Sequence, residues 1–432
     1  MDPKGFAERL RASLAEFSPP VRSLLDVDFY KFTMGQLIHY YFPYTEVAFR
    51  LIVRDAKIPL TEFVGEEDLR RCLDYAMDLR FSVDELDFLR KTDVSGKSMF
   101  RDRYLDFLRD FRLPPYQLKM TDGTIELVFP GCWPKVSPWE TIALAIVSEL
   151  YYRRVLRHTP IETLKKIYER AEARLRNKLD KLATHPYIAF ADFGQRRRHS
   201  FLWQEHVLEL CRDTLGQQFT GTSNTYLAWR HNLPAIGTNA HELPMVMTAL
   251  ASSDEKMRQA QYHVLELWQT IYGQDLRIFL PDTYGSEQFF AGAPEWLKDW
   301  RGQRQDSGDP KIEGERYASW LRERGVDPAE RLTIFSDGLD VDPMIEIGSH
   351  FEGKHQHAYG WGTLLTNDFT GCDPANPNLR PFSMVCKVVA ANGRPCVKLS
   401  NNPAKATGPA AEVQRYLRVF GNKGRADQPV LV

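Results

Sequence analysis

A histidine follows an apolar run in the segment IGTNAHE (236–242), and Glu242 stands directly beside it. A neutral imidazole can act as a base, and a neighbouring carboxylate can orient the ring and raise its basicity. His241 is therefore a candidate catalytic residue that Glu242 could orient. A zinc protease is not indicated, because the second histidine of an HExxH helix is absent and Pro244 interrupts the helix. A lone histidine is more often structural, so this candidate depends on the neighbouring motifs.

Acidic residues also follow apolar runs, at positions where strands are expected to end. They are Asp282, Asp306, Asp309, Asp337 and Asp340. Such carboxylates could bind sugar hydroxyls, or hold Mg²⁺ together with substrate phosphates. Any one of them could instead cap the next helix. Three such turns in one domain favour a ribose-phosphate site.

Two glycine turns, 336–338 and 360–363, follow apolar runs as well. Glycine lets backbone N–H groups turn toward an anion, so the two turns together suggest a phosphate site. Either turn alone could be required only by the backbone conformation. A third segment, 192–194, is followed by three arginines, 196–198. A run of charges is usually a solvated surface, but these arginines could bind a carboxylate or phosphate, and Phe193 could stack on a flat ring.

Metal-binding patterns are weak in this chain. The six cysteines are scattered without CxxC spacing, so neither a zinc ribbon nor a disulfide framework is expected. Lys354, His355 and His357 could form a metal or phosphate cluster, but we expect exposed loop residues there. Direct metal ligands are not assigned by the sequence.

The bulk composition limits the classes of function. The chain has 432 residues, 43% of them hydrophobic and 26% charged, with a formal net charge of −1. A protein that binds nucleic acid or acidic membranes through its overall charge needs an excess of basic residues, and this chain has no such excess. No apolar stretch approaches the ~20 residues of a membrane span, and the N-terminus does not resemble a signal peptide. We expect a cytoplasmic protein without nucleic-acid or membrane partners.

The elements that must position these residues fall into two patterns. Residues 46–54 predict a strand, and two hairpins are expected, at 116–129 and, around Asn392-Gly393, at 384–399. Residues 139–156 predict a buried helix, and 161–182 an amphipathic helix. From residue 187 onward, strands alternate with helices such as 242–272 and 312–324, which predicts a parallel sheet.

Functional residues at the ends of successive strands favour a βα barrel over an open doubly wound sheet. We therefore predict an α/β protein with an irregular, incomplete βα barrel. The barrel is expected over 157–383. An additional α/β domain is expected to combine residues 1–156 with a C-terminal return, 384–432.

Seven segments together resemble a known family. In chain order they are LDVDFYKFTM (25–34), FADFGQRRRHS (190–200), GTSNTYLA (221–228), IGTNAHE (236–242), RQDSGDP (304–310), FSDGLD (335–340) and GWGTLLTNDF (360–369). Each is weak alone, but their order from about residue 23 to 405 is similar to that of bacterial nicotinate phosphoribosyltransferases. The resemblance implies a type II phosphoribosyltransferase fold and a homodimer with shared sites. It also implies the conversion of nicotinate and phosphoribosyl pyrophosphate to nicotinate mononucleotide and pyrophosphate, with Mg²⁺ and ATP as co-substrate.

The resemblance also implies roles for single residues. His241 matches a histidine that ATP phosphorylates, and Arg304 and Asp306 match the segment that meets the ribose and its phosphates. Phe193 matches one stacking partner of the pyridine ring, and Tyr30 matches the other, supplied by the neighbouring subunit. The remaining expected substrate-binding residues are Arg196 near the carboxylate or phosphoribosyl group, Thr222 and Ser223 of GTSN, Asp337 on the ribose hydroxyls, and Gly338, Gly360 and Gly362 around the 5′-phosphate.

Two alternatives remain at this point. A nicotinamide-using relative typically has aspartate where this chain has Ser223, so nicotinate is favoured. A non-catalytic phosphosugar-binding protein is disfavoured by the presence of Arg304, Asp306 and His241. Leu243 and Gln195 depart from the residues familiar at these positions, which leaves fine substrate detail open.

Overall fold

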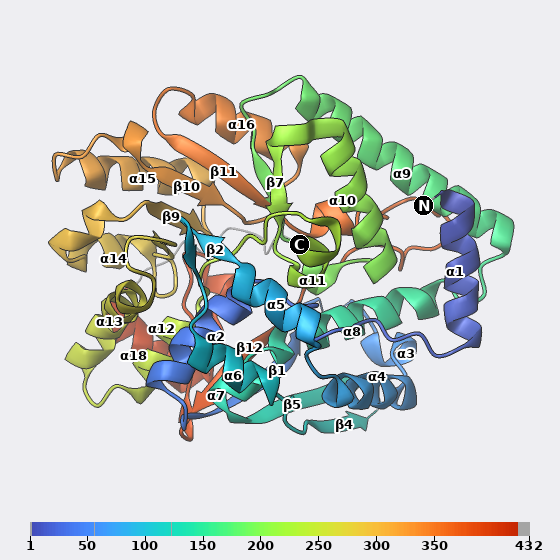
Figure 1. The fold of residues 1–432 in the computed structure, drawn as a ribbon, viewed down its shortest axis with the longest axis horizontal. Helices are drawn as coiled ribbons and strands as arrows, with labels where there is room; N and C mark the ends of the chain where they lie inside the picture. Colours follow the sequence, from blue (N-terminus) through green and yellow to red (C-terminus); the bar gives the residue numbers. More distant parts are fainter. Residues whose placement is uncertain (1, 56, 122, 422–432) are drawn as a thin grey trace.

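Two separate sheets organise the chain (Figure 1). The computed structural model describes residues 2–55, 57–121 and 123–421. One sheet has six parallel strands in the order β7-β6-β11-β10-β9-β8. Its strands are β6 (Phe190–Asp192), β7 (Phe219–Thr222), β8 (Ile278–Phe279), β9 (Gly302–Gln305), β10 (Leu332–Phe335) and β11 (Gln356–Trp361).

Helices connect these parallel strands, as the alternating pattern predicts. They are α10 (Phe201–Leu215), α11 (Thr225–His231), α12 (Glu242–Leu250), α13 (Asp254–Tyr272), α14 (Ser286–Gly292), α15 (Pro310–Arg322) and α16 (Val341–Phe351), and the short α17 (Thr363–Thr366) follows the last strand, β11. The helix expected over 242–272 is two helices, because the Ser253 hydroxyl accepts the N–H of Lys256 and starts a new one. No pairing joins β7 to β8 among the described residues, so the expected incomplete barrel is confirmed.

The second sheet is antiparallel, in the order β13-β12-β1-β5-β4. Its strands are β1 (Glu46–Val53), β4 (Gln117–Thr121), β5 (Thr124–Cys132), β12 (Met384–Ala391) and β13 (Arg394–Pro395). Asn392 and Gly393 have φ angles of 45° and 76°, which the turn of a tight hairpin requires. Because β12 pairs with β1, the C-terminal hairpin returns to the N-terminal sheet as expected. Residues 410–420 instead pack against α13, and residues 422–432 lie outside the described part.

The helix α8 (Trp139–Val155) is buried over most of its length and contacts β12, β1 and the short turn η1 (Gln195–Arg197). It therefore ties the antiparallel sheet to the end of β6. The amphipathic helix α9 (Ile161–Ala183) buries its apolar stripe as expected. The other helices are α1 (Pro3–Ala15), α2 (Tyr30–Tyr41), α3 (Leu60–Phe63), α4 (Glu66–Asp78), α5 (Val83–Lys91), α6 (Asp102–Arg109), α7 (Trp133–Val136) and α18 (Ala410–Phe420).

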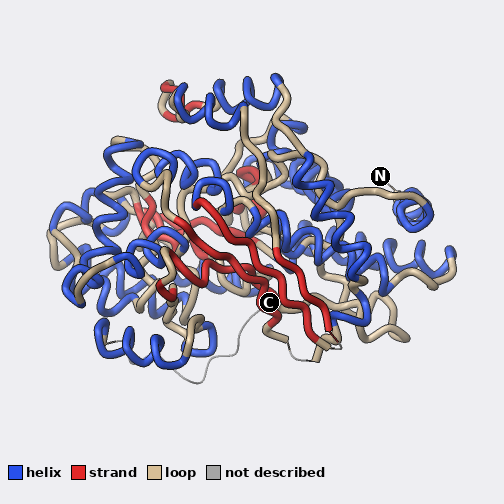
Figure 2. The backbone as a smooth tube through the Cα atoms, turned by 90° about the horizontal axis from the view of Figure 1, so that it is seen from below, coloured by secondary structure: helices blue, strands red, loops and turns tan. Residues whose placement is uncertain are grey.

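The strands run through the middle of the molecule, and helices lie outside them (Figure 2). The few remaining elements are short. They are the hairpin of β2 (Asp93–Val94) with β3 (Lys97–Ser98), and the single turns η2 (Gly216–Gln218), η3 (Glu295–Asp299), η4 (Pro328–Glu330) and η5 (Pro403–Lys405). In the described part of the chain, no helix combines the length and apolarity that a membrane crossing needs.

Candidate active site

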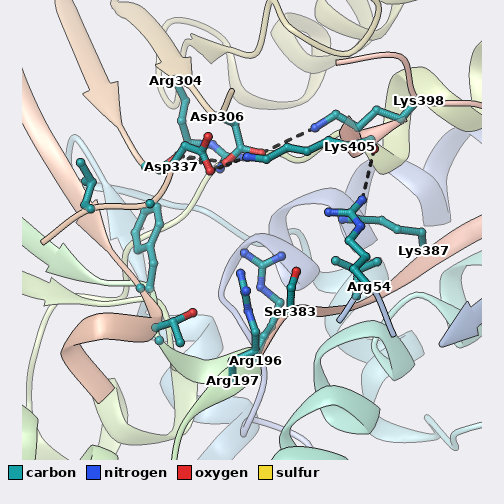
Figure 3. A pocket seen from close by; sticks show the side chains of 18 of the residues that line it. Arg54, Arg196, Arg197, Arg304, Asp306, Asp337, Ser383, Lys387, Lys398 and Lys405 are labelled. Atoms are coloured by element: carbon teal, nitrogen blue, oxygen red, sulfur yellow. Dashed lines mark hydrogen bonds and ion pairs between the residues drawn. The ribbon is translucent and has the colours of Figure 1, made fainter. Parts of the chain in front are cut away.

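A cavity of about 110 Å³ opens where the carboxyl ends of parallel strands face β12 of the antiparallel sheet (Figure 3). Seven basic and two acidic side chains are among the described residues that line it. Figure 3 shows that they converge from both halves of the chain. They are Arg54, Arg196, Arg197, Arg304, Lys387, Lys398 and Lys405, with Asp306 and Asp337.

This excess of positive charge suits an anion with several negative charges. In a cavity with low-dielectric walls, cations attract and bind phosphate groups more strongly than they would on the surface. The cations also repel one another: burial, followed by the charges of Arg196 and Arg54, lowers the pKa of Arg197 to about 10. A phosphate or pyrophosphate group would relieve this repulsion.

Five of the seven basic residues were not among the expected site residues. Arg197 was noted only as part of a basic run, Arg54 directly follows β1, and the other three lie in the C-terminal return. Two of them, Lys387 and Lys398, stand within the apolar runs MVCKVVA and PCVKL. A lysine inside an otherwise buried run is unusual, and this signal could have identified Lys387 and Lys398 from the sequence.

The residues expected on ribose and phosphate are brought together. Arg304 Nη1 donates to Asp306 Oδ1 at 2.8 Å and to Ser336 Oγ at 3.3 Å. Lys405 Nζ donates to Asp337 Oδ1, so each acid of the cavity has a basic partner. Gly338, with a φ of 58°, lines the cavity beside Asp337. The ends of β9 and β10 thus present polar and charged groups to the same space.

His241 is buried just behind this cavity, with 3% of its surface exposed. Its Nε2 lies 2.9 Å from Asp306 Oδ2, and its Nδ1 lies 2.9 Å from Thr283 Oγ1. Because an ionised carboxylate only accepts hydrogen bonds, Nε2 carries the proton and Nδ1 accepts from the threonine hydroxyl. Burial lowers the pKa of His241 to about 4, so the imidazole is neutral near pH 7. Asp306 remains ionised, because Arg304 and His241 outweigh the effect of burial and lower its pKa.

The expectation that Glu242 orients His241 is wrong. The Glu242 carboxylate lies 2.5 Å from Lys31 Nζ and accepts the Trp133 Nε1–H at 2.7 Å. The reason is the start of α12 at Glu242, since neighbouring side chains of a helix point in different directions. Asp306, distant in sequence, orients the imidazole instead.

The expected aromatic and glycine positions divide into two groups. Phe193 and Gly362 line the cavity. Gly360 does not, because it lies beneath the Phe193 ring, where a Cβ atom would come within 2.3 Å of Phe193 Cδ2. The absence of a side chain at Gly360 therefore makes room for this ring.

The segment that leads into α2 reaches Arg196. Arg196 Nε lies 3.4 Å from Asp28 Oδ2. The Tyr30 hydroxyl is buried and has no hydrogen-bond partner among the described residues. The segment before α2 crosses the end of β7, where Phe29 N–H donates to the Ser223 carbonyl.

The side chains of the GTSN segment are engaged within the protein. Ser223 Oγ donates to Asp28 Oδ1 at 2.6 Å. Thr222 is fully buried and donates to Asp192 Oδ2 at 2.7 Å. Thr222 therefore fixes the loop after β6 and does not face the cavity.

One group of side chains could hold a cation. Ligand atoms of His241, Asp282 and Asp306 all lie within 4.8 Å of one another. Asp282 Oδ1 is buried and has no hydrogen-bond partner among the described residues. Lys398 Nζ lies 3.7 Å from Asp282 and 3.8 Å from Asp306. The oxygen donors suit Mg²⁺, and Asp282 has a free oxygen to offer.

Lys354, His355 and His357 do not form a cluster of ligands. Lys354 Nζ is paired with Glu315 Oε1 at 3.0 Å. His355 is only 6% exposed and packs against the Phe351 ring, with centroids 4.1 Å apart. The expectation of exposed loop positions is wrong for His355, because the turn after α16 folds it against the core, and also for His357, which is half-buried in strand β11.

Comparisons with known proteins agree along most of the chain. Residues 25–148 match the family model of the nicotinate phosphoribosyltransferase N-terminal domain, and residues 188–424 match that of the nicotinate phosphoribosyltransferase family. The nicotinate phosphoribosyltransferase of Porphyromonas gingivalis is 30% identical, with a TM-score of 0.82 over 93% of this chain and 100% of that one. The enzyme of Vibrio cholerae is 30% identical, with a TM-score of 0.83 over 96% of each chain. A Saccharomyces cerevisiae structure shares the fold, with a TM-score of 0.81 at 24% identity over 94% of this chain and 99% of that one.

Proposed function

The chain belongs to the nicotinate phosphoribosyltransferase family, and we propose that it converts nicotinate and phosphoribosyl pyrophosphate to nicotinate mononucleotide and pyrophosphate, as a step of NAD salvage. The observation that carries the proposal is the buried cavity with seven basic side chains beside Phe193. The cations match the phosphate and pyrophosphate of one substrate, and the aromatic ring matches the flat pyridine of the other.

The reaction needs stabilisation of charge rather than a protein nucleophile. Breaking the bond to pyrophosphate leaves positive charge on the ribose and negative charge on the leaving group. Arginine and lysine side chains that are fixed before the reaction stabilise that leaving group. Phe193 holds the pyridine so that its nitrogen can approach the anomeric carbon. Asp337, at the end of β10, would bind the ribose hydroxyls.

The direct test is product formation by the purified protein. With nicotinate and phosphoribosyl pyrophosphate we expect pyrophosphate release and nicotinate mononucleotide. Nicotinamide should react far more slowly, because position 223 carries a serine, which tolerates the carboxylate of nicotinate, where nicotinamide-using relatives typically have an aspartate that accepts from the carboxamide. Faster reaction with nicotinamide would overturn the substrate assignment. No pyrophosphate release with either substrate would favour a phosphosugar-binding protein.

We further propose that ATP hydrolysis drives the reaction through phosphorylation of His241. Asp306 accepts the Nε2–H at 2.9 Å and keeps it in place, so the lone pair is on Nδ1. Nδ1 forms a bond to the γ-phosphorus of ATP while the bond to the ADP oxygen breaks, and the nearby Asp306 carboxylate stabilises the positive charge that develops on the ring. The low pKa of His241, about 4 because of burial, supports this step, since a neutral imidazole is nucleophilic.

Mg²⁺ is the proposed cofactor. Asp282 and Asp306 would hold it, directly or through water, and it would neutralise charge on the bound pyrophosphate. The unpaired oxygen of Asp282 supports this assignment. All six cysteines are free, which fits the reducing cytoplasm that we propose as the location.

We further propose a homodimer with shared sites, in which Tyr30 of one subunit faces the cavity of the other. Arg304 and Lys405 line one cavity within the chain, whereas Tyr30 does not line it. Mixing an inactive Arg304→Ala variant with an inactive Tyr30→Ala variant should therefore restore activity in proportion to hybrid dimers, because one of the two sites then carries neither substitution. If the mixture recovers no activity, each chain carries a complete site.

Gly360→Ala is expected to weaken nicotinate binding through Phe193. The new Cβ would lie 2.3 Å from the ring, so the ring must move. Aromatic stacking contributes about 0.5–1.5 kcal/mol, so KM for nicotinate should rise roughly three- to tenfold. In a Phe193→Ala background the substitution should add nothing. Gly65→Ala is the control, because its Cβ meets nothing closer than 3.7 Å and KM should not change.

A further inference from the structure

A chain of buried ion pairs joins the start of α12 to the cavity. Lys31 Nζ, at the start of α2, lies 2.5 Å from Glu242 Oε2 and 2.6 Å from Glu140 Oε2. Glu140 Oε1 in turn lies 3.0 Å from Lys387 Nζ and 4.0 Å from Arg196 Nη1. Both of these cations line the cavity. Glu242, Lys31 and Glu140 together form the Lys31 triad.

These three side chains are almost completely removed from water. The side chain of Lys31 is 1% exposed, and those of Glu140 and Glu242 are each 3% exposed. Burial alone would lower the pKa of Lys31, but the two carboxylates outweigh it and raise that pKa. Likewise, Lys31 and Lys387 outweigh the effect of burial on Glu140 and lower its pKa. Because removal of one partner would leave an uncompensated buried charge, these groups must keep or change their arrangement together.

The first turn of α2 also contacts the His241 loop through neutral groups. Thr33 Oγ1 donates to the carbonyl of Thr238. Gly237 approaches the same turn so closely that a Cβ there would lie 2.9 Å from Tyr30 N. Asp28, just before the same turn, lies 3.4 Å from Arg196 Nε. The start of α2 thus contacts the loop, and the residues just before it contact a cavity arginine.

We propose that Lys31 is a positioning residue that holds the His241 loop and the cavity cations Arg196 and Lys387 in one arrangement. Because of this arrangement, a phosphoryl group on His241 alters the binding of phosphoribosyl pyrophosphate. The inference rests on the proposed phosphorylation. His241 and Glu242 are adjacent in the backbone, so a displacement of the loop moves Glu242. Lys31 and Glu140 must then follow, and the counter-ion of both cavity cations is displaced.

The test compares KM for phosphoribosyl pyrophosphate with and without saturating ATP. In the wild type we expect ATP to lower this KM on the order of tenfold, a usual size for coupling between two sites. In Lys31→Met the ratio should fall below about twofold, although γ-labelled ATP still phosphorylates His241. Glu242→Gln should do the same, because the amide keeps the shape and loses the charge. Glu242→Gln therefore tests the role of Lys31 even if Lys31→Met does not fold.

Glu149→Gln is the matched control. Glu149 lies on α8, like Glu140, and it is also buried and paired, with Arg153 at 2.6 Å. Among the described residues it forms no ion pair with the Lys31 triad. This variant should keep the wild-type ratio even if its melting temperature falls. If Lys31→Met or Glu242→Gln keeps the wild-type ratio of the two KM values, the proposed role of Lys31 is wrong, but the proposed phosphorylation of His241 is not affected. A wild type with neither labelling nor an ATP effect would overturn the phosphorylation of His241 as well.

Discussion

His241→Asn should abolish the formation of acid-labile phosphoprotein from γ-labelled ATP and uncouple ATP from product formation. Asparagine has no ring nitrogen that can accept a phosphoryl group, yet its amide can still bond to Asp306 or Thr283. Transfer without ATP should persist at a reduced rate, because the cations that stabilise pyrophosphate stay in place. The measurement is acid-labile label per chain, together with the ratio of ATP hydrolysed to nicotinate mononucleotide formed.

Two variants make this result specific. Asp306→Asn should also lose most of the labelling although His241 remains, because a neutral amide no longer stabilises the positive charge that develops on the ring when Nδ1 is phosphorylated. His199→Asn is the control, since this buried histidine stacks on Phe369 at 3.7 Å and lies outside the cavity lining. It should label normally if folded. Full coupling in His241→Asn would show that ATP drives the reaction by another route.

Residues at the ends of the parallel strands could be predicted from the sequence because each lies in a short motif. An apolar run followed by a small or charged residue identifies both the strand and its end, and parallel strands bring these ends to one edge of the sheet. Asp306, Asp337 and Phe193 therefore lie where the pattern predicts. Thr222 does not face the cavity, because its hydroxyl is directed to Asp192. A short motif does not predict the direction of a side chain at the end of a strand.

The second half of the cavity could not be predicted in the same way. Lys387, Lys398 and Lys405 belong to the C-terminal return, and they reach the site only because β12 pairs with β1 across more than three hundred residues of sequence. The sequence predicted this pairing, but it did not predict which face of the hairpin meets the parallel sheet. The misassigned partner of His241 has the same cause. Asp306 replaces Glu242 because spatial proximity, and not adjacency in sequence, decides the contact.

Lys398 is expected to determine how substrate affinity depends on alkaline pH. Burial lowers the pKa of its ammonium group to about 8, although Asp282 and Asp306 act in the opposite direction. The group is charged at neutral pH and loses its charge as the pH rises above about 8. Since the charged form attracts phosphate groups, KM for phosphoribosyl pyrophosphate should rise through this range. A KM profile between neutral pH and pH of about 9 would measure it.

Lys398→Met should remove this dependence and weaken binding at every pH. Hydrogen bonds to charged groups contribute about 1.5–3 kcal/mol, so KM at neutral pH should rise on the order of ten- to hundredfold. Lys398→Arg should keep affinity closer to the wild type and show no change near pH of about 8, because guanidinium stays charged. Lys4→Met, at an exposed lysine, should change nothing. If the rise in KM survives in Lys398→Arg, another group titrates, and the buried ammonium of Lys398 does not control anion binding.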